Sequence, residues 1–270
     1  MLISNSARSG ATVIYGSVNL LVLTSQNDSV CTVTLNRPEC LNALNEPLLG
    51  ALKEAILNAN ADPSINVIVL RGAGRAFCTG KDLKEHQDLG LDRQATHRAI
   101  ALLQGISRGI LFGEKIVIAG VQGWAVGGGL EIMIACDLVV LGESAQLLYP
   151  EMSLGLFVTG AVTALLPQMI GFSQAKALFL SDEPMQAQSA KDIGLVWRVV
   201  ADEEFDKELM QAAQKISLMP QNAQRELKRI MISGLREDIE KAFEMEANAA
   251  LSSSLDKESM QRVIQNRNKN

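Results

Sequence analysis

The chain has 270 residues, of which 47% are hydrophobic and 20% are charged, as is usual for a globular protein with a large core. Its net charge is −5 and only 4% of its residues are aromatic, so we expect no nucleic-acid partner. No apolar run approaches the length of about 18 residues that would cross a membrane. Four cysteines without a C-x-x-C pair and two histidines argue against a metal site and favour a reducing, cytoplasmic location.

The first half of the chain alternates predicted strands and helices. Residues 1–17 are small and polar, lack the apolar segment of a secretory signal, and are predicted to be a flexible tail. Apolar runs at 18–23 and 30–35, separated by the polar residues 25–29, predict a hairpin. Glu46-Pro47 then opens a helix that ends at Asp62-Pro63, because proline fits the first turn of a helix.

The same alternation continues through the middle of the chain. The predicted strands are 67–70, 115–122, 138–141, 146–148 and 195–200, and the predicted helices are 92–112, 130–136, 162–170, 173–180 and 187–192. Strand–strand–helix units therefore recur, which predicts an α/β core over residues 18–201. Residues 202–270 are helical throughout, and their apolar stripes require a partner surface, either this core or another subunit.

A glycine triplet, Gly127-Gly128-Gly129, joins a predicted buried strand to a short helix. The N–H groups in the first turn of a helix lack partners within it and carry the positive end of the helix dipole, so this turn is suited to binding an anion. Glu131 lies on the same helical face as Gly128, and Glu151 follows twenty residues later. Polarising donors beside a proton-transferring acid indicate an enzyme.

Four segments, at 36–44, 76–84, 123–131 and 145–155, resemble in order and spacing the signature segments of the crotonase superfamily, the enoyl-CoA hydratase/isomerase fold. The resemblance implies a spiral of repeated β-β-α units with a helical C-terminal oligomerisation region at 202–270. It further implies a homotrimer, or a hexamer made of two trimers. The substrate would be an acyl-CoA thioester, and no cofactor is implied because CoA arrives as part of the substrate.

The resemblance also implies a role for individual residues. The backbone N–H groups of Lys81 and Gly128 would form an oxyanion hole for the thioester carbonyl, and Glu131 and Glu151 would exchange protons with water and substrate. The residues expected to bind the substrate are Asp82, Leu83, Lys84, Gly127 and Thr159, with Lys84 and Arg37 as candidate partners of the CoA phosphates.

One segment departs from the family pattern. Val158-Thr159 stands where a Pro-Gly pair is typical, and Ala161 and Val162 replace glycines. Enoyl-CoA hydration is the leading hypothesis, and the departure leaves two alternatives: an isomerase or other acyl-CoA lyase, and a catalytically idle acyl-CoA-binding relative. Lys81 replaces a small residue, so its side chain is expected to be a surface charge or a phosphate contact. His86 and His97 are expected to be solvated.

Overall fold

A computed structural model describes residues 21–85 and 92–267 of the chain, and their side chains as far as residue 265. The predicted tail at 1–17 and His86 lie outside the described residues. Within those residues no helix is long and apolar enough to cross a membrane.

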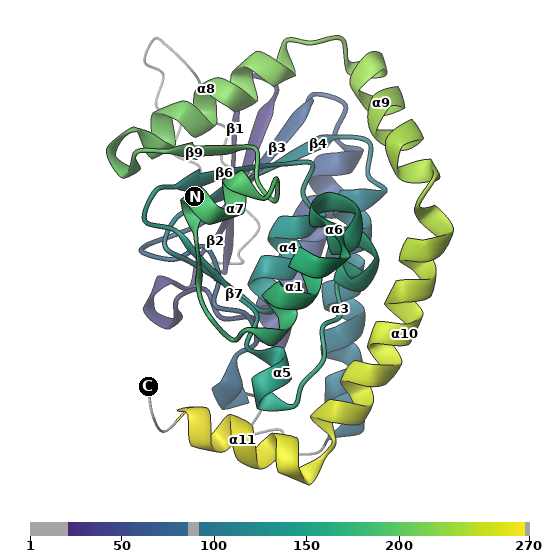
Figure 1. Cartoon of the computed structure of the whole chain (residues 1–270). Helices are drawn as coiled ribbons and strands as arrows, with labels where there is room; N and C mark the ends of the chain where they lie inside the picture. The colour runs from purple at the N-terminus through teal and green to yellow at the C-terminus, as the bar shows by residue number, and fades with distance from the viewer. Residues whose placement is uncertain (1–20, 86–91, 268–270) are drawn as a thin grey trace, which may run out of the picture.

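Two sheets form the α/β core (Figure 1). In the larger sheet the first two strands are antiparallel, and every other pair of neighbouring strands is parallel. Its strands, in spatial order, are β1 (Val22–Asn27), β2 (Val30–Leu35), β3 (Val67–Gly72), β4 (Ile116–Val121), β6 (Leu138–Gly142) and β9 (Arg198–Val200). The smaller sheet consists of β5 (Trp124–Val126), β7 (Gln146–Leu148) and β8 (Met185–Gln186).

The hairpin differs from the prediction in where its first strand runs. Residues 25–27, predicted as loop, belong to β1 and pair with residues 30–32 of β2. The connection is only Asp28-Ser29, and Asp28 takes a left-handed φ of 52° that aspartate tolerates in a tight turn. Polar residues are accommodated in β1 because it is an edge strand with half of its surface solvated.

Strand–helix units repeat around the core and confirm the predicted spiral. Helix α1 (Glu46–Ala61) follows the hairpin, α3 (Arg93–Leu111) follows β3, and α4 (Gly128–Ala135) follows β4 and β5. Asn45 caps α1 by accepting a hydrogen bond from Leu48 N at 3.0 Å. Every residue of α4 is buried, so this helix forms the centre of the molecule. The short elements β5 and α5 (Glu151–Leu154) were not predicted.

The remaining helices surround the core, and Figure 1 shows α8 to α11 following one another along the outside of the molecule. Helix α8 buries Phe205 and Leu209 against one face of the large sheet, and α10 places Ile239 and Phe243 in the main core. Residues 202–267 therefore share their core with residues 21–201. The helices predicted at 162–170 and 173–180 both lie within α6, and the non-helical backbone of Gly171 (φ 76°, ψ 158°) separates them. The helices of this part are α6 (Val162–Leu180), α7 (Ala187–Asp192), α8 (Phe205–Ser217), α9 (Gln221–Ser233), α10 (Arg236–Ser254) and α11 (Lys257–Arg267).

A buried asparagine ties the segment after β2 to the glycine-rich loop after β3. Asn42 is fully buried and has a left-handed φ of 56°. Its side chain accepts a hydrogen bond from Arg37 N at 2.9 Å and donates to the carbonyls of Ala73 and Ala76, each at 2.9 Å. One side chain thus satisfies three backbone groups and fixes where the loop begins.

We expect Asn42→Ala to lower the free energy of unfolding by about 3 kcal/mol, because it leaves buried backbone groups without partners. The left-handed backbone, which alanine tolerates less well than asparagine, adds to the loss. Chemical denaturation at a fixed protein concentration measures the effect, and Asn58→Ala at an exposed position of α1 is the matched control. Equal stability of the two variants would contradict this role.

Candidate active site

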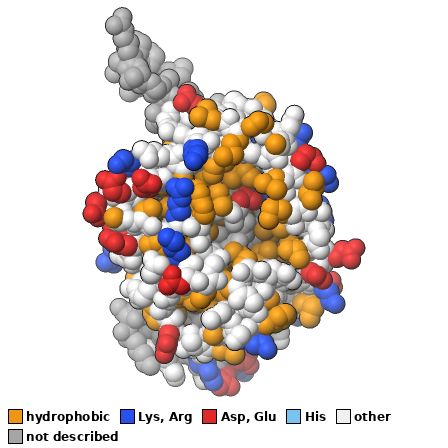
Figure 2. Space-filling model, turned by 45° about the horizontal axis from the view of Figure 1, so that its top comes forward, with side chains coloured by type: hydrophobic (Ala, Val, Ile, Leu, Met, Phe, Trp, Pro, Cys, Tyr) orange, Lys and Arg blue, Asp and Glu red, His pale blue; other side chains and the backbone are white. Residues whose placement is uncertain are grey.

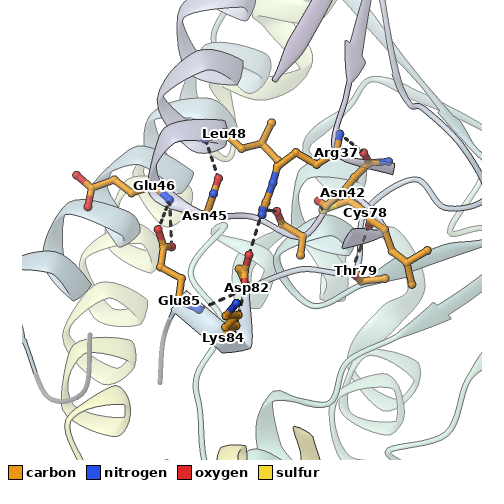
Figure 3. A network of polar contacts seen from close by, with 12 residues as sticks. Arg37, Asn42, Asn45, Glu46, Leu48, Cys78, Thr79, Asp82, Lys84 and Glu85 are labelled. Atoms are coloured by element: carbon orange, nitrogen blue, oxygen red, sulfur yellow. Dashed lines mark hydrogen bonds and ion pairs between the residues drawn. The ribbon is translucent and has the colours of Figure 1, made fainter. Parts of the chain in front are cut away.

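The segment 78–82 lies alongside Leu44 and β5, within the network of polar contacts in Figure 3. Leu44 N donates to the carbonyl of Gly80 at 2.7 Å, and Asp82 N donates to the carbonyl of Leu44 at 3.0 Å. In this strand-like pairing the N–H of the intervening residue, Lys81, points away from Leu44. Within the described part of the chain that N–H donates no hydrogen bond, so it is available to a ligand.

This segment approaches the N-terminus of α4 so closely that only glycine fits. A Cβ on Gly80 would lie 2.5 Å from the carbonyl oxygen of Val126 and 3.2 Å from Gly128 N. Gly128 is the first residue of α4, where an N–H has no acceptor within the helix. The predicted donors Lys81 N and Gly128 N therefore belong to adjoining segments at the positive end of the α4 dipole.

The two predicted glutamates come from different helices and have different surroundings. Glu131 of α4 is 2% exposed, and its carboxylate accepts hydrogen bonds from Thr159 N at 3.1 Å and Thr159 Oγ1 at 2.8 Å. Glu151 begins α5, and a Cβ on Gly127 would lie 2.1 Å from its Oε1. Glu151 Oε2 is buried and has no hydrogen-bond partner among the described residues. Glu131 is thus held in place, whereas one oxygen of Glu151 is open to a ligand.

A cavity of about 100 Å³ brings these groups together. Lys81, Gly128, Glu131, Glu151 and Thr159 all line it. The other side chains of its wall are mostly apolar, among them Leu44, Leu49, Ala99, Ile100, Leu103, Leu156, Phe157 and Ala250. A water molecule needs only about 10–15 Å³ of such space, so the cavity has room for several waters beside the carboxyl groups.

Burial sets the protonation of the carboxyl pair. It raises the pKa of Glu131 well above its usual range, and the nearby Glu151 and Glu246 add to this, opposed by the hydrogen bonds from Thr159. Burial also raises the pKa of Glu151 to about 7, opposed by its own backbone N–H and by Lys81. The pair therefore retains a proton near neutral pH, which gives the site both a proton donor and a proton acceptor.

The side chain of Lys81 was expected to be a surface charge or a phosphate contact, and the structure places it elsewhere than on the open surface. It lines the cavity with the glutamates. Burial lowers its pKa to about 8, against the opposing influence of Glu151 and Glu85. The chain therefore places a cation inside the site, and no sequence signal beyond the replacement of a small residue indicated it.

Asp82 and Arg37 are both engaged within the loop network (Figure 3). Arg37 Nη1 pairs with Asp82 Oδ2 at 3.1 Å and donates to the carbonyl of Ala43 at 2.6 Å, so both contacts hold this end of the guanidinium in the loop network. Asp82 Oδ1 accepts from Lys84 N at 3.1 Å and from Glu85 N at 3.2 Å. Neither residue lines the cavity, so a contribution of Asp82 to binding would act through the shape of the loop.

The other predicted residues lie at the edge of the site or outside it. Lys84 is exposed, and Leu83 is partly buried against a small apolar cluster of Leu154, Leu156 and Val263. His97 is exposed on α3, as expected. Cys31 and Cys136 are buried free thiols. The described residues contain no cluster of three or more side chains that could hold a metal ion.

Two residues near the glutamates were not found from the sequence. Tyr149 is fully buried, and its hydroxyl has no hydrogen-bond partner in the described structure. Burial and three surrounding glutamates raise its pKa far above the usual value, so the phenol stays neutral. Glu246 of α10 is 1% exposed and reaches the segment that contains Thr159. Tyr149 precedes Pro150 without any distinguishing pattern, and Glu246 belongs to an ordinary helix of mixed charge.

Comparisons with known proteins identify relatives of this chain. The family model described as enoyl-CoA hydratase/isomerase matches residues 25–269. The crotonyl-CoA hydratase of Syntrophomonas wolfei is 32% identical over 229 residues, which cover 84% of this chain and 87% of that protein. A probable enoyl-CoA hydratase of Rhizobium meliloti is 37% identical over 196 residues, covering 73% and 75% of the two chains.

A solved structure shares the whole architecture. The crystal structure of an enoyl-CoA hydratase/isomerase from Mycobacterium paratuberculosis superposes with a TM-score of 0.86 at 27% identity, covering 91% of this chain and 98% of that one. The family match extends over the core and the C-terminal helices alike. The chain belongs to the enoyl-CoA hydratase/isomerase family of the crotonase superfamily.

Proposed function

We propose that the protein is an enoyl-CoA hydratase that adds water across the double bond of a 2-enoyl-CoA thioester, a reaction of fatty acid metabolism. The observation that carries the proposal is a single cavity lined by two buried glutamates beside two backbone N–H donors. The names of the relatives at 32% and 37% identity support the same activity. No cofactor is proposed, because the reaction needs only water, an acid, a base and stabilisation of negative charge.

In this proposal the thioester oxygen accepts hydrogen bonds from Lys81 N and Gly128 N. Addition at C3 moves electron density from the double bond onto that oxygen, forming an enolate. Fixed donors at the positive end of α4 stabilise the charge without having to reorganise. Loss of one such donor typically slows a reaction by about 10²–10³-fold. Leu83 and Lys84, at the edge of the site, would contact the CoA portion of the substrate.

The carboxyl pair supplies both proton transfers. The ionised glutamate takes a proton from water as the water oxygen bonds to C3, and the protonated glutamate delivers a proton to C2. The number of protons on the pair is the same before and after the reaction. Thr159 donates hydrogen bonds to the carboxylate of Glu131, and Gly127 leaves space for the carboxylate of Glu151. Both residues therefore act on the carboxyl groups rather than on the carbon chain of the substrate.

The second candidate function is a double-bond isomerase or another lyase of the same family, in which one glutamate does most of the work. The unequal surroundings of the pair favour it: Glu131 accepts two hydrogen bonds from Thr159, and one oxygen of Glu151 accepts none. An idle acyl-CoA-binding relative is the third candidate, supported only by the altered segment 156–162.

Assembly into a homotrimer or a hexamer is part of the proposal, as is a cytoplasmic location, which the free buried thiols support. Large apolar side chains are exposed at the end of α8 and along α9, and Figure 2 shows hydrophobic side chains gathered on one face of the molecule. The exposed apolar residues at the end of α8 and along α9 are Leu218, Met219, Leu227, Ile230 and Met231, with exposures of 46–85%. A second copy of this chain is the proposed occupant, because covering this surface would remove it from water.

We expect Glu131→Gln and Glu151→Gln each to lower kcat by about 10²–10⁴-fold, because each removes one of the two proton-transferring groups. Loss of the conjugated enoyl absorbance measures turnover on a panel of 2-enoyl-CoA esters. Glu244→Gln, at an exposed position of α10, is the control. Near-normal rates in both active-site variants would contradict hydration, and a strongly unequal effect would favour isomerisation.

Lys81→Met is expected to move the acidic limb of the kcat profile to higher pH. Lys81 lowers the pKa of Glu151, so its removal raises that pKa, and the base is then ionised only at higher pH. The backbone N–H at position 81 is retained, so the oxyanion hole keeps its donor. Lys176→Met, at an exposed position of α6, should leave the profile unchanged. An unmoved acidic limb in Lys81→Met would show that the ammonium does not act on the pair.

Light scattering of the purified protein should give a mass three or six times that of one chain. Met231→Asp should reduce this mass, because it places a charge in the apolar stripe of α9. Glu226→Asp on the same helix is the control, since it keeps the charge pattern. A monomer in the unsubstituted protein would contradict the assembly.

A further inference from the structure

A buried glutamate of α10 satisfies the N-terminus of α6. Glu246 accepts hydrogen bonds from Ala161 N at 2.6 Å through Oε2, and from Thr163 N at 2.8 Å and Thr163 Oγ1 at 2.6 Å through Oε1. It is 1% exposed, so these bonds are shielded from water. Backbone N–H groups at the start of a helix need such acceptors, and the helix dipole favours a negative charge there.

The segment that Glu246 holds also contacts the catalytic carboxylate. Thr159, two residues before Ala161, gives Glu131 both of its hydrogen bonds. A Cβ on Gly160 would lie 2.9 Å from Glu131 Cβ and 3.0 Å from Glu131 Oε2. Residues 159–163 are therefore fixed by Glu131 on one side and by Glu246 on the other.

The backbone of this segment needs an external restraint. Ala161 has a left-handed φ of 62°, a conformation that residues with a side chain rarely adopt. The residue at the cap position of α6 is this same alanine, whose side chain cannot accept a hydrogen bond from the first turn. Glu246, 85 residues further along the chain, supplies both the acceptor for Ala161 N and the missing cap.

We propose that Glu246 is a positioning residue: by holding residues 159–163, it keeps Thr159 bonded to Glu131 and so aims the Glu131 carboxylate into the cavity. The inference rests on the proposed function, in which Glu131 transfers a proton. Glu246 does not line the cavity, whereas Ala250 and Ser254, which follow it on α10, do. Its substitution should therefore change kcat more than KM.

The charge of Glu246 acts on Glu131 as well. The titratable groups that face Glu131 are Glu151 of α5, Tyr149 just before it, and Glu246 of α10. Glu246 adds to the rise in the pKa of Glu131, so its neutralisation should lower that pKa. Loss of the Lys81 ammonium has the opposite effect on a different group, because it should raise the pKa of Glu151.

The experiment compares Glu246→Gln and Glu246→Ala with the matched pair Glu244→Gln and Glu244→Ala, whose position on α10 is exposed. Glutamine can keep both Thr163 bonds through its carbonyl oxygen and removes the charge, whereas alanine removes all three bonds. We expect kcat of Glu246→Ala to fall by about 10²-fold with a smaller change in KM, because the carboxylate is displaced. Glu246→Gln should recover part of kcat, with the basic limb of its profile at lower pH, because Glu131 then loses its proton at lower pH.

A readout that does not need turnover separates this inference from the proposed function. The infrared carbonyl band of protonated Glu131, identified by its absence in Glu131→Gln, is titrated in each variant. In Glu246→Gln its midpoint should fall, and in Glu244→Gln it should not move. In Glu246→Ala, Thr159 is displaced and no longer lowers the pKa of Glu131, so the midpoint should lie above that of Glu246→Gln. This difference would support the positioning role even if no enoyl-CoA ester were hydrated. Equal midpoints in the two variants, or a kcat in Glu246→Ala equal to that of Glu244→Ala, would overturn it.

Discussion

The structure depends on burying two carboxyl groups side by side in one small cavity. Isolated carboxylates in a protein interior are strongly destabilising, and two of them repel each other. The surroundings of Glu131 and Glu151 offset this cost in part through the hydrogen bonds from Thr159, the Lys81 ammonium and the retained proton. A site arranged in this way is ready to exchange protons near neutral pH, which is the chemistry that the proposed reaction uses.

Close approach of backbone segments is the steric condition for this arrangement. Gly127 leaves room for the carboxylate of Glu151. Gly80 lets the segment 78–82 approach the N-terminus of α4. Gly160 lets the segment that contains Thr159 lie against Glu131. Any Cβ at these positions would come within 3.0 Å of a neighbouring atom. The glycines therefore act together, and each permits one contact that the carboxyl pair or the proposed oxyanion hole requires.

Much of the site could be predicted because its residues lie close together in the sequence or carry a family signature. The strand, glycine turn and helix at 115–136 have strong apolar patterns, and Glu131 lies only three residues after Gly128 in the same helix. The side-chain direction of Lys81 could not be predicted, since it depends on the pairing of its segment with Leu44. Glu246 was missed for a different reason: its partners are 83 and 85 residues away in the sequence, so no local pattern connects it to them. The boundary at residue 201 is likewise no structural division, because Phe243 and Leu209 complete cores begun by the strands.

The most direct test of the account is a crystal structure of the protein with a bound 3-hydroxyacyl-CoA, the product of the proposed reaction. The account predicts that the thioester oxygen accepts hydrogen bonds from both Lys81 N and Gly128 N, with the 3-hydroxyl group between the carboxyl groups of Glu131 and Glu151. A thioester bound away from these two donors, or a hydroxyl group out of reach of both glutamates, would contradict it.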